Sequence, residues 1–195
     1  MIYFIDTEFL EGKQNKTLFG IKYGQTKPTI DLISIGLVDM DEREFYAISK
    51  DFNLKEAWNR WQPRTGEGDR NNVQPKKYWI RENVLHPIFI ELTDIYVSEV
   101  IKMNRLGIGG SKDVFEFNYE NLKYLLNLYG RTNNQIANEI CEFIYGYETD
   151  LSGQSPLQLA QRYEVSDKTK IPELYAYFAD YDFVVFCWIF GNMMS

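Results

Sequence analysis

Two carboxylates in the first apolar run of the chain constrain its fold and chemistry more than any other feature. The N-terminal segment is Ile-Tyr-Phe-Ile-Asp-Thr-Glu-Phe, and its aromatic and β-branched residues predict a β-strand around Tyr3–Ile5. Side chains alternate along a strand, so Asp6 and Glu8 are expected to point the same way. Two like charges at the end of a buried strand are unfavourable unless a cation such as Mg²⁺ lies between them. The alternative is that Glu8 has already left the strand and both carboxylates are solvated.

The composition predicts one globular domain in a reducing compartment. The 195 residues are 45% hydrophobic and 16% aromatic, enough for a sizeable core, and we expect a single domain over residues 1–195. The N-terminus lacks the basic and long apolar regions of a signal peptide, and no apolar run is long enough to span a bilayer. Cys141 and Cys187 form no metal-binding motif. We therefore expect a cytoplasmic protein with no membrane partner.

Basic residues are concentrated in one segment, although the net charge of −7 argues against a general polyanion binder. Between positions 60 and 81 there are six basic residues, namely Arg60, Arg64, Arg70, Lys76, Lys77 and Arg81, against two acidic ones. Four aromatic rings lie in or beside this stretch: Trp58, Trp61, Tyr78 and Trp79. Cations interleaved with rings suit a single nucleic-acid strand, through its backbone and its bases. The alternative is a surface loop whose rings anchor it to the core.

The predicted elements are an antiparallel meander, then helices, then one strand and a last helix. The meander has three strands, around residues 3–5 and at 30–39 and 44–49, with a loop or irregular hairpin extension at 11–29. Helical patterns follow at 54–61, 80–92, 119–129 and 133–145, with Thr132 as the N-cap of the last. A strand at 173–178 and a turn at 179–182 precede an apolar helix at 183–191.

Five motifs in this order resemble the DEDD superfamily of 3′–5′ exonucleases, and more closely its branch with the polyadenylate-directed exoribonucleases. They are Phe-Ile-Asp-Thr-Glu-Phe at 4–9, Asp-Leu-Ile-Ser-Ile-Gly at 31–36, Phe-Tyr-Ala-Ile-Ser at 45–49, Trp-Ile-Arg-Glu-Asn-Val-Leu at 79–85 and Ala-Tyr-Phe-Ala-Asp-Tyr-Asp at 176–182. They extend along the chain, with a poorly matching stretch near residues 92–118. The resemblance implies an α/β, RNase-H-like fold: a mixed sheet that opens with the three-strand antiparallel meander and is flanked by helices.

The resemblance also implies a metal site. Asp6, Glu8 and Asp182 match the acidic ligands of two Mg²⁺ or Mn²⁺ ions, which would support hydrolysis of a phosphodiester bond. Asp6 would bridge the ions, Glu8 would hold the ion that bears the nucleophile, and Asp182 would reach in from the strand-to-helix turn. Thr7 and Phe9 would contact the terminal nucleotide. For Asp182 the simpler alternative is a helix N-cap, a role that aspartate often has.

One part of the family pattern is not recognisable in this sequence. The family has a final helix with a general-base histidine and a last metal-binding aspartate, whereas the single histidine here, His86, matches another part of the pattern. We expect a chain that is C-terminally incomplete relative to the family and impaired on its own. It would then self-associate or need a complementing C-terminal segment.

The expected function is that of a 3′–5′ exonuclease acting on single-stranded RNA, with DNA left open. A catalytically incomplete descendant that binds nucleic acid or a partner is the alternative.

Overall fold

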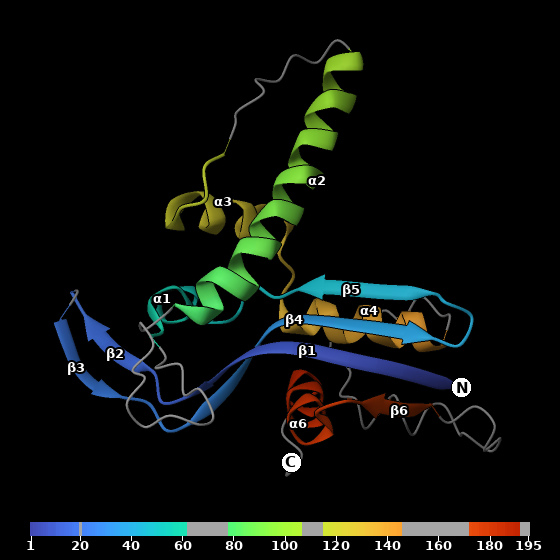
Figure 1. The fold of residues 1–195 in the computed structure, drawn as a ribbon, viewed down its shortest axis with the longest axis horizontal. Helices are drawn as coiled ribbons and strands as arrows, with labels where there is room; N and C mark the ends of the chain where they lie inside the picture. The colour runs from blue at the N-terminus through green and yellow to red at the C-terminus, as the bar shows by residue number, and fades with distance from the viewer. Residues whose placement is uncertain (20, 62–77, 107–114, 146–171, 192–195) are drawn as a thin grey trace, which may run out of the picture. The chain divides into compact units, whose positions relative to one another are not determined.

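The computed structural model describes residues 1–19, 21–61, 78–106, 115–145 and 172–191 (Figure 1). The chain divides into two compact units. Unit 1 consists of Met1–Lys13, Lys27–Phe52 and Arg131–Ser195, and unit 2 of Gln14–Thr26 and Asn53–Gly130. The single-domain organisation of residues 1–195 stays a prediction.

Unit 1 is built on a mixed four-stranded sheet of order β5-β4-β1-β6 (Figure 1). Its strands are β1 (Ile2–Gly12), β4 (Thr29–Asp39), β5 (Glu44–Ile48) and β6 (Glu173–Ala176). β1 pairs antiparallel with β4, and β4 pairs antiparallel with β5, so the predicted meander is confirmed. β6 adds to the other edge of β1 in parallel. The mixed α/β class is as predicted, and the RNase-H-like assignment stays a prediction.

The core of unit 1 joins this sheet to two helices, α4 (Asn133–Tyr145) and α6 (Ala179–Ile189). Tyr3 and Ile5 of β1 are buried while Phe4 between them is exposed, which is the alternation expected of a strand with one covered face. The helices contribute apolar side chains to the same cluster: Ile136, Ile140 and Ile144 from α4, and Val185 and Ile189 from α6.

The N-cap of α4 is as predicted. The Gln135 N–H donates to Thr132 Oγ1 at 3.2 Å, and the Thr132 N–H donates to Gln135 Oε1 at 2.8 Å. This reciprocal pair is a capping box, which satisfies backbone donors that have no partner inside the helix.

The predicted turn at residues 179–182 is wrong, because α6 already begins at Ala179. The N-cap position is Phe178, which makes no capping side-chain hydrogen bond, and the Asp182 N–H donates to the Phe178 carbonyl at 3.2 Å. Asp182 is therefore a helical residue of the first turn and not an N-cap. Two acidic residues in that turn, Asp180 and Asp182, are favoured by the positive end of the helix dipole.

Unit 2 contains a two-stranded hairpin and helices. The hairpin, β2 (Asn15–Leu18) and β3 (Ile21–Gln25), lies in the segment where a loop or hairpin extension was expected. The helices are α1 (Leu54–Asn59), a π-helical segment (Arg81–Leu85) continuous with α2 (His86–Arg105), and α3 (Tyr119–Tyr129). The sequence predicts that the helix beginning at residue 80 ends at residue 92, whereas α2 continues for thirteen more residues, to Arg105. Throughout the described parts of the chain, no helix combines the length and the hydrophobicity needed to cross a bilayer.

Adjacent valines of α6 test how this helix packs. Val185→Ala should lower the free energy of unfolding by about 2 kcal/mol, because the side chain is only 1% exposed. Val184→Ala removes the same groups from a residue that is 37% exposed, so its loss should stay below about 1 kcal/mol. Urea unfolding followed by circular dichroism measures both variants. Equal losses would contradict the observed orientation of α6.

Candidate functional site

The candidate site lies where β6 ends and the edge of β1 becomes open. The last pair between these strands joins Ile5 to Ala176, so β6 offers no partner at Thr7. The chain then enters α6, which carries Asp182 in its first turn. The Thr7 N–H donates to Asp182 Oδ1 at 3.0 Å, and the Thr7 hydroxyl donates to the same oxygen at 2.6 Å. Asp182 thus satisfies a backbone donor of β1 beyond the end of β6.

The other oxygen of Asp182 has no such partner. The residue is 2% exposed, and within the described residues its buried Oδ2 accepts no hydrogen bond. A buried carboxylate oxygen without a donor is unfavourable, and in native structures it often indicates a bound water or ion. Oδ2 is therefore the atom of this site that we expect to contact a bound water or ion.

Asp6 and Glu8 lie on either side of Thr7 in β1. Asp6 is exposed, Thr7 is buried and Glu8 is half-buried, which follows the strand alternation. The pKa of Asp6 is raised by partial desolvation and then by the charge of Asp182, while a hydrogen bond from the Thr7 backbone opposes the shift. The pKa of Glu8 is raised by desolvation, then by Asp6 and by Asp182. The three carboxylates are thus close enough to repel one another.

The donor chemistry fits a hard divalent cation, because all three residues offer carboxylate oxygens and one of these oxygens is buried without a partner. The positions of the described side chains, in contrast, do not yet form a metal site. In the part of the chain that the structure describes, no three His, Cys, Asp or Glu side chains are gathered tightly enough to hold a metal ion. The assignment of Asp6, Glu8 and Asp182 as ligands to two metal ions therefore stays a prediction.

Thr7 and Phe9 have structural contacts that the sequence did not reveal. The Thr7 hydroxyl is buried against Asp182, and the ring of Phe9 stacks on Tyr181 with centroids 5.5 Å apart and planes 12° from parallel. Contact of Thr7 and Phe9 with a nucleotide stays a prediction. Sequence reasoning missed Tyr181, which is 48% exposed, although its place immediately before Asp182 was a usable signal.

The basic, Trp-rich segment is described only at its two ends, which belong to unit 2. The Arg81 guanidinium carbon lies 3.9 Å from the ring centroid of Tyr78 and 4.6 Å from that of Trp58, and Arg81 Nε donates to the Trp58 carbonyl at 2.8 Å. Arg81 therefore joins the two described ends of this segment. Arg64, Arg70, Lys76 and Lys77 lie outside the described residues, so the expected contact with nucleic acid stays a prediction.

The only histidine, His86, also belongs to unit 2. Its ring centroid lies 4.6 Å from that of Phe117, a contact typical of a packing role.

Part of this chain is similar to 3′–5′ exoribonucleases. Two proteins of that description, from Mycobacterium tuberculosis strains CDC 1551 / Oshkosh and ATCC 25618 / H37Rv, are each 38% identical to it over 76 residues. The match covers 39% of this chain and 32% of each relative, so the chain spans about a third of the length of these curated relatives. No protein-family model matches the chain. The similarity supports a relationship to nucleases over the matched part.

Replacement of Thr7 by valine tests the support of Asp182. Thr7→Val keeps the volume but removes a donor to a buried carboxylate, so it should lower the free energy of unfolding by about 1–3 kcal/mol. A matched control in the same sheet is Thr29→Val, because Thr29 is only partly buried and donates to the Gly12 carbonyl at a longer 3.4 Å. Chemical unfolding at neutral pH should show a clearly smaller loss for the control. A loss at Thr7 no larger than at Thr29 would contradict this role.

The repulsion among the carboxylates predicts a pH-dependent gain in stability when one charge is removed. Because the folded-state pKa of Asp6 and of Glu8 is raised, their ionisation destabilises the metal-free fold above that pKa, and the penalty vanishes below the ordinary values of 3.8 and 4.5. Asp6→Asn and Glu8→Gln should therefore stabilise the metal-free protein at neutral pH and confer no such gain in acid. Thermal unfolding in chelator, with Glu44→Gln on β5 as a charge-matched control, measures this. A destabilised Asp6→Asn protein at neutral pH would count against the electrostatic account.

Proposed function

We propose that this protein is a 3′–5′ exonuclease that hydrolyses phosphodiester bonds of single-stranded nucleic acid, with RNA as its substrate. The observation that carries the proposal is the Asp182 carboxylate, which is held at Thr7 within electrostatic reach of Asp6 and Glu8. The partial similarity to 3′–5′ exoribonucleases supports the same class of reaction.

The side chains at the site divide into positioning and binding roles. Thr7 is a positioning residue, because its two donors hold Asp182 Oδ1 and so leave Oδ2 for a ligand. Asp6, Glu8 and Asp182 would hold two Mg²⁺ or Mn²⁺ ions. When bound, these ions would activate water and stabilise the charge that develops on the phosphate. Without a cation the same residues repel one another, which favours a site that is completed by its cofactor.

The stacked pair Phe9 and Tyr181 would contact the terminal base. Phe9 follows Glu8 in the chain and Tyr181 precedes Asp182, so both rings are tied to residues of the proposed site. Stacking of a base on an aromatic ring tolerates any base, which suits an exonuclease that removes successive nucleotides.

A second candidate function is nucleic-acid binding without catalysis. The observation that favours it is the absence, within the described residues, of a group of three side chains tight enough to hold a metal ion. In that case Asp182 would serve to close the edge of β1 beside α6.

A nuclease assay separates the two candidates. With Mn²⁺ and a 5′-labelled single-stranded RNA, we expect shortening from the 3′ end that stops when the 3′ end is blocked. Asp182→Asn should reduce the rate by more than the roughly 10–100-fold typical of a residue that only orients a metal ligand. Asp180→Asn is the matched control, because Asp180 is exposed in the same helical turn.

Two results would contradict the proposal. RNA that is bound but never shortened would favour the non-catalytic candidate. Equal activity of Asp182→Asn and Asp180→Asn would place the reaction elsewhere in the protein.

A further inference from the structure

Unit 2 contains a polar pocket between the hairpin and the α1 segment. It has a volume of about 320 Å³ and is lined by Asn15, Lys22, Asn53, Lys55, Glu56 and Asn59. All of its lining residues belong to unit 2, whereas the three carboxylates belong to unit 1. Neither the sequence motifs nor the proposed hydrolysis uses any of these side chains.

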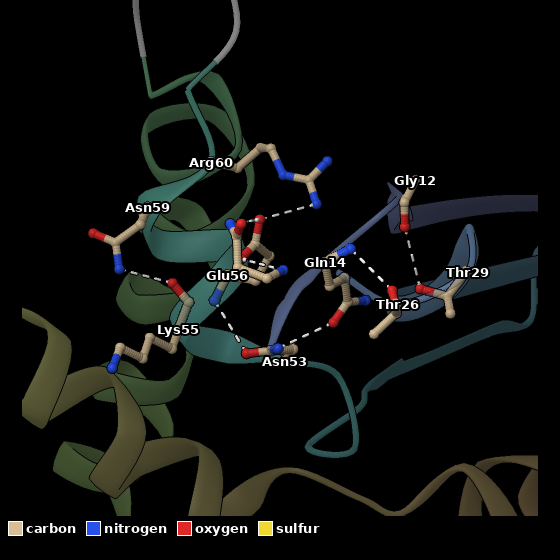
Figure 2. Close-up of polar contacts among 10 residues, drawn as sticks. Gly12, Gln14, Thr26, Thr29, Asn53, Lys55, Glu56, Asn59 and Arg60 are labelled. Atoms are coloured by element: carbon tan, nitrogen blue, oxygen red, sulfur yellow. Dashed lines mark hydrogen bonds and ion pairs between the residues drawn. The ribbon is translucent and has the colours of Figure 1, made fainter. Parts of the chain in front are cut away.

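The acidic residue of the pocket is held by its neighbours. The Asn15 side-chain amide donates to the Glu56 carboxylate at 3.1 and 3.3 Å, and Arg60 lies 3.3 Å from Glu56 Oε1. Figure 2 shows the guanidinium of Arg60, the C-cap residue of α1, directed toward Glu56. The charge of Glu56 is therefore compensated before any ligand binds.

The wall formed by Asn53 is also held in place. Asn53 Oδ1 accepts from the Glu56 N–H at 3.1 Å, and Asn53 Nδ2 donates to Gln14 Oε1 at 3.0 Å (Figure 2). Gln14 is only 5% exposed, so it fixes the hairpin side of this contact. Asn15, Asn53 and Glu56 are thus held in place by hydrogen bonds within unit 2.

The remaining charges of the pocket are positive. Among the described residues, neither Lys22 nor Lys55 takes part in an ion pair, and both are exposed. They come from β3 and α1, so two separate elements each contribute one basic residue to the lining of the pocket. Asn59 adds an amide that uses one N–H on the Lys55 carbonyl at 2.8 Å and keeps a second N–H.

We propose that this pocket is a subsite for a backbone phosphate of single-stranded nucleic acid. Ammonium groups and amide N–H groups are donors that phosphate oxygens accept, and the excess positive charge disfavours a metal cation. The protein has a net charge of −7, so we expect a polyanion to bind only where basic side chains outnumber acidic ones. The lining of this pocket meets that condition, with Lys22 and Lys55 against Glu56. The identity of the strand rests on the proposed function; phosphate binding itself does not.

The test is binding of a labelled single-stranded oligoribonucleotide in chelator, where no metal-dependent hydrolysis takes place. The double variant Lys22→Gln/Lys55→Gln should bind severalfold more weakly. Its plot of log affinity against log salt, between about 50 and 200 mM, should be flatter by roughly 0.7 for each phosphate that the variant no longer neutralises. Lys102→Gln/Lys123→Gln is the control, because it removes the same charge from exposed residues of α2 and α3 in the same unit.

A second readout localises the binding. The side-chain amide resonances of Asn53 and Asn59 should shift in a ¹⁵N NMR titration with the oligoribonucleotide, and these shifts should be absent in the Lys22→Gln/Lys55→Gln protein.

Unchanged affinity and salt slope in that double variant, or equal effects of the control variant, would overturn the proposal. NMR shifts of Asn53 and Asn59 that occur with inorganic phosphate, and not with the oligoribonucleotide, would indicate a small phosphorylated ligand. That result would overturn the proposal that the pocket binds a nucleic-acid strand. Because no step requires catalysis, a failed nuclease assay leaves these results interpretable.

Discussion

The contact between Thr7 and Asp182 is the interaction on which the candidate site in unit 1 depends. The pairing of β6 with β1 ends at the pair Ala176–Ile5. Two residues after Ile5, the N–H of Thr7 would have no partner from β6. Asp182 accepts from that N–H and from the Thr7 hydroxyl, so a residue 175 positions away is held beside β1. This placement adds a buried negative charge near Asp6 and Glu8. The fold therefore maintains a repulsion that a cation would relieve.

Much of the local structure could be predicted because it depends on short-range patterns. The alternation around Asp6 and Glu8, the three-strand meander and the Thr132 cap follow from residues adjacent in sequence or a few positions apart. Helices α3 and α4 were predicted with the bounds observed, since each has an apolar face that repeats with the helical period.

The features that sequence reasoning missed depend on distant contacts. The start of α6 at Ala179 could not be read locally, because it is linked to burial of Asp182 against β1. The positioning role of Thr7 needs the position where β6 ends, and that position is set by strand pairing. The pocket beside α1 has the same origin, since Lys22 and Lys55 come together only when the hairpin folds near α1.

When metal is present, we expect Asp6, Glu8 and Asp182 to form one cation site. The most direct measurement is the anomalous difference density of crystals soaked in Mn²⁺. We expect a peak in contact with Asp182 Oδ2 and with at least one carboxylate oxygen of Asp6 or Glu8, and no such peak in the Asp182→Asn protein. A well-ordered site without density between these carboxylates, or density that persists unchanged in the variant, would contradict it.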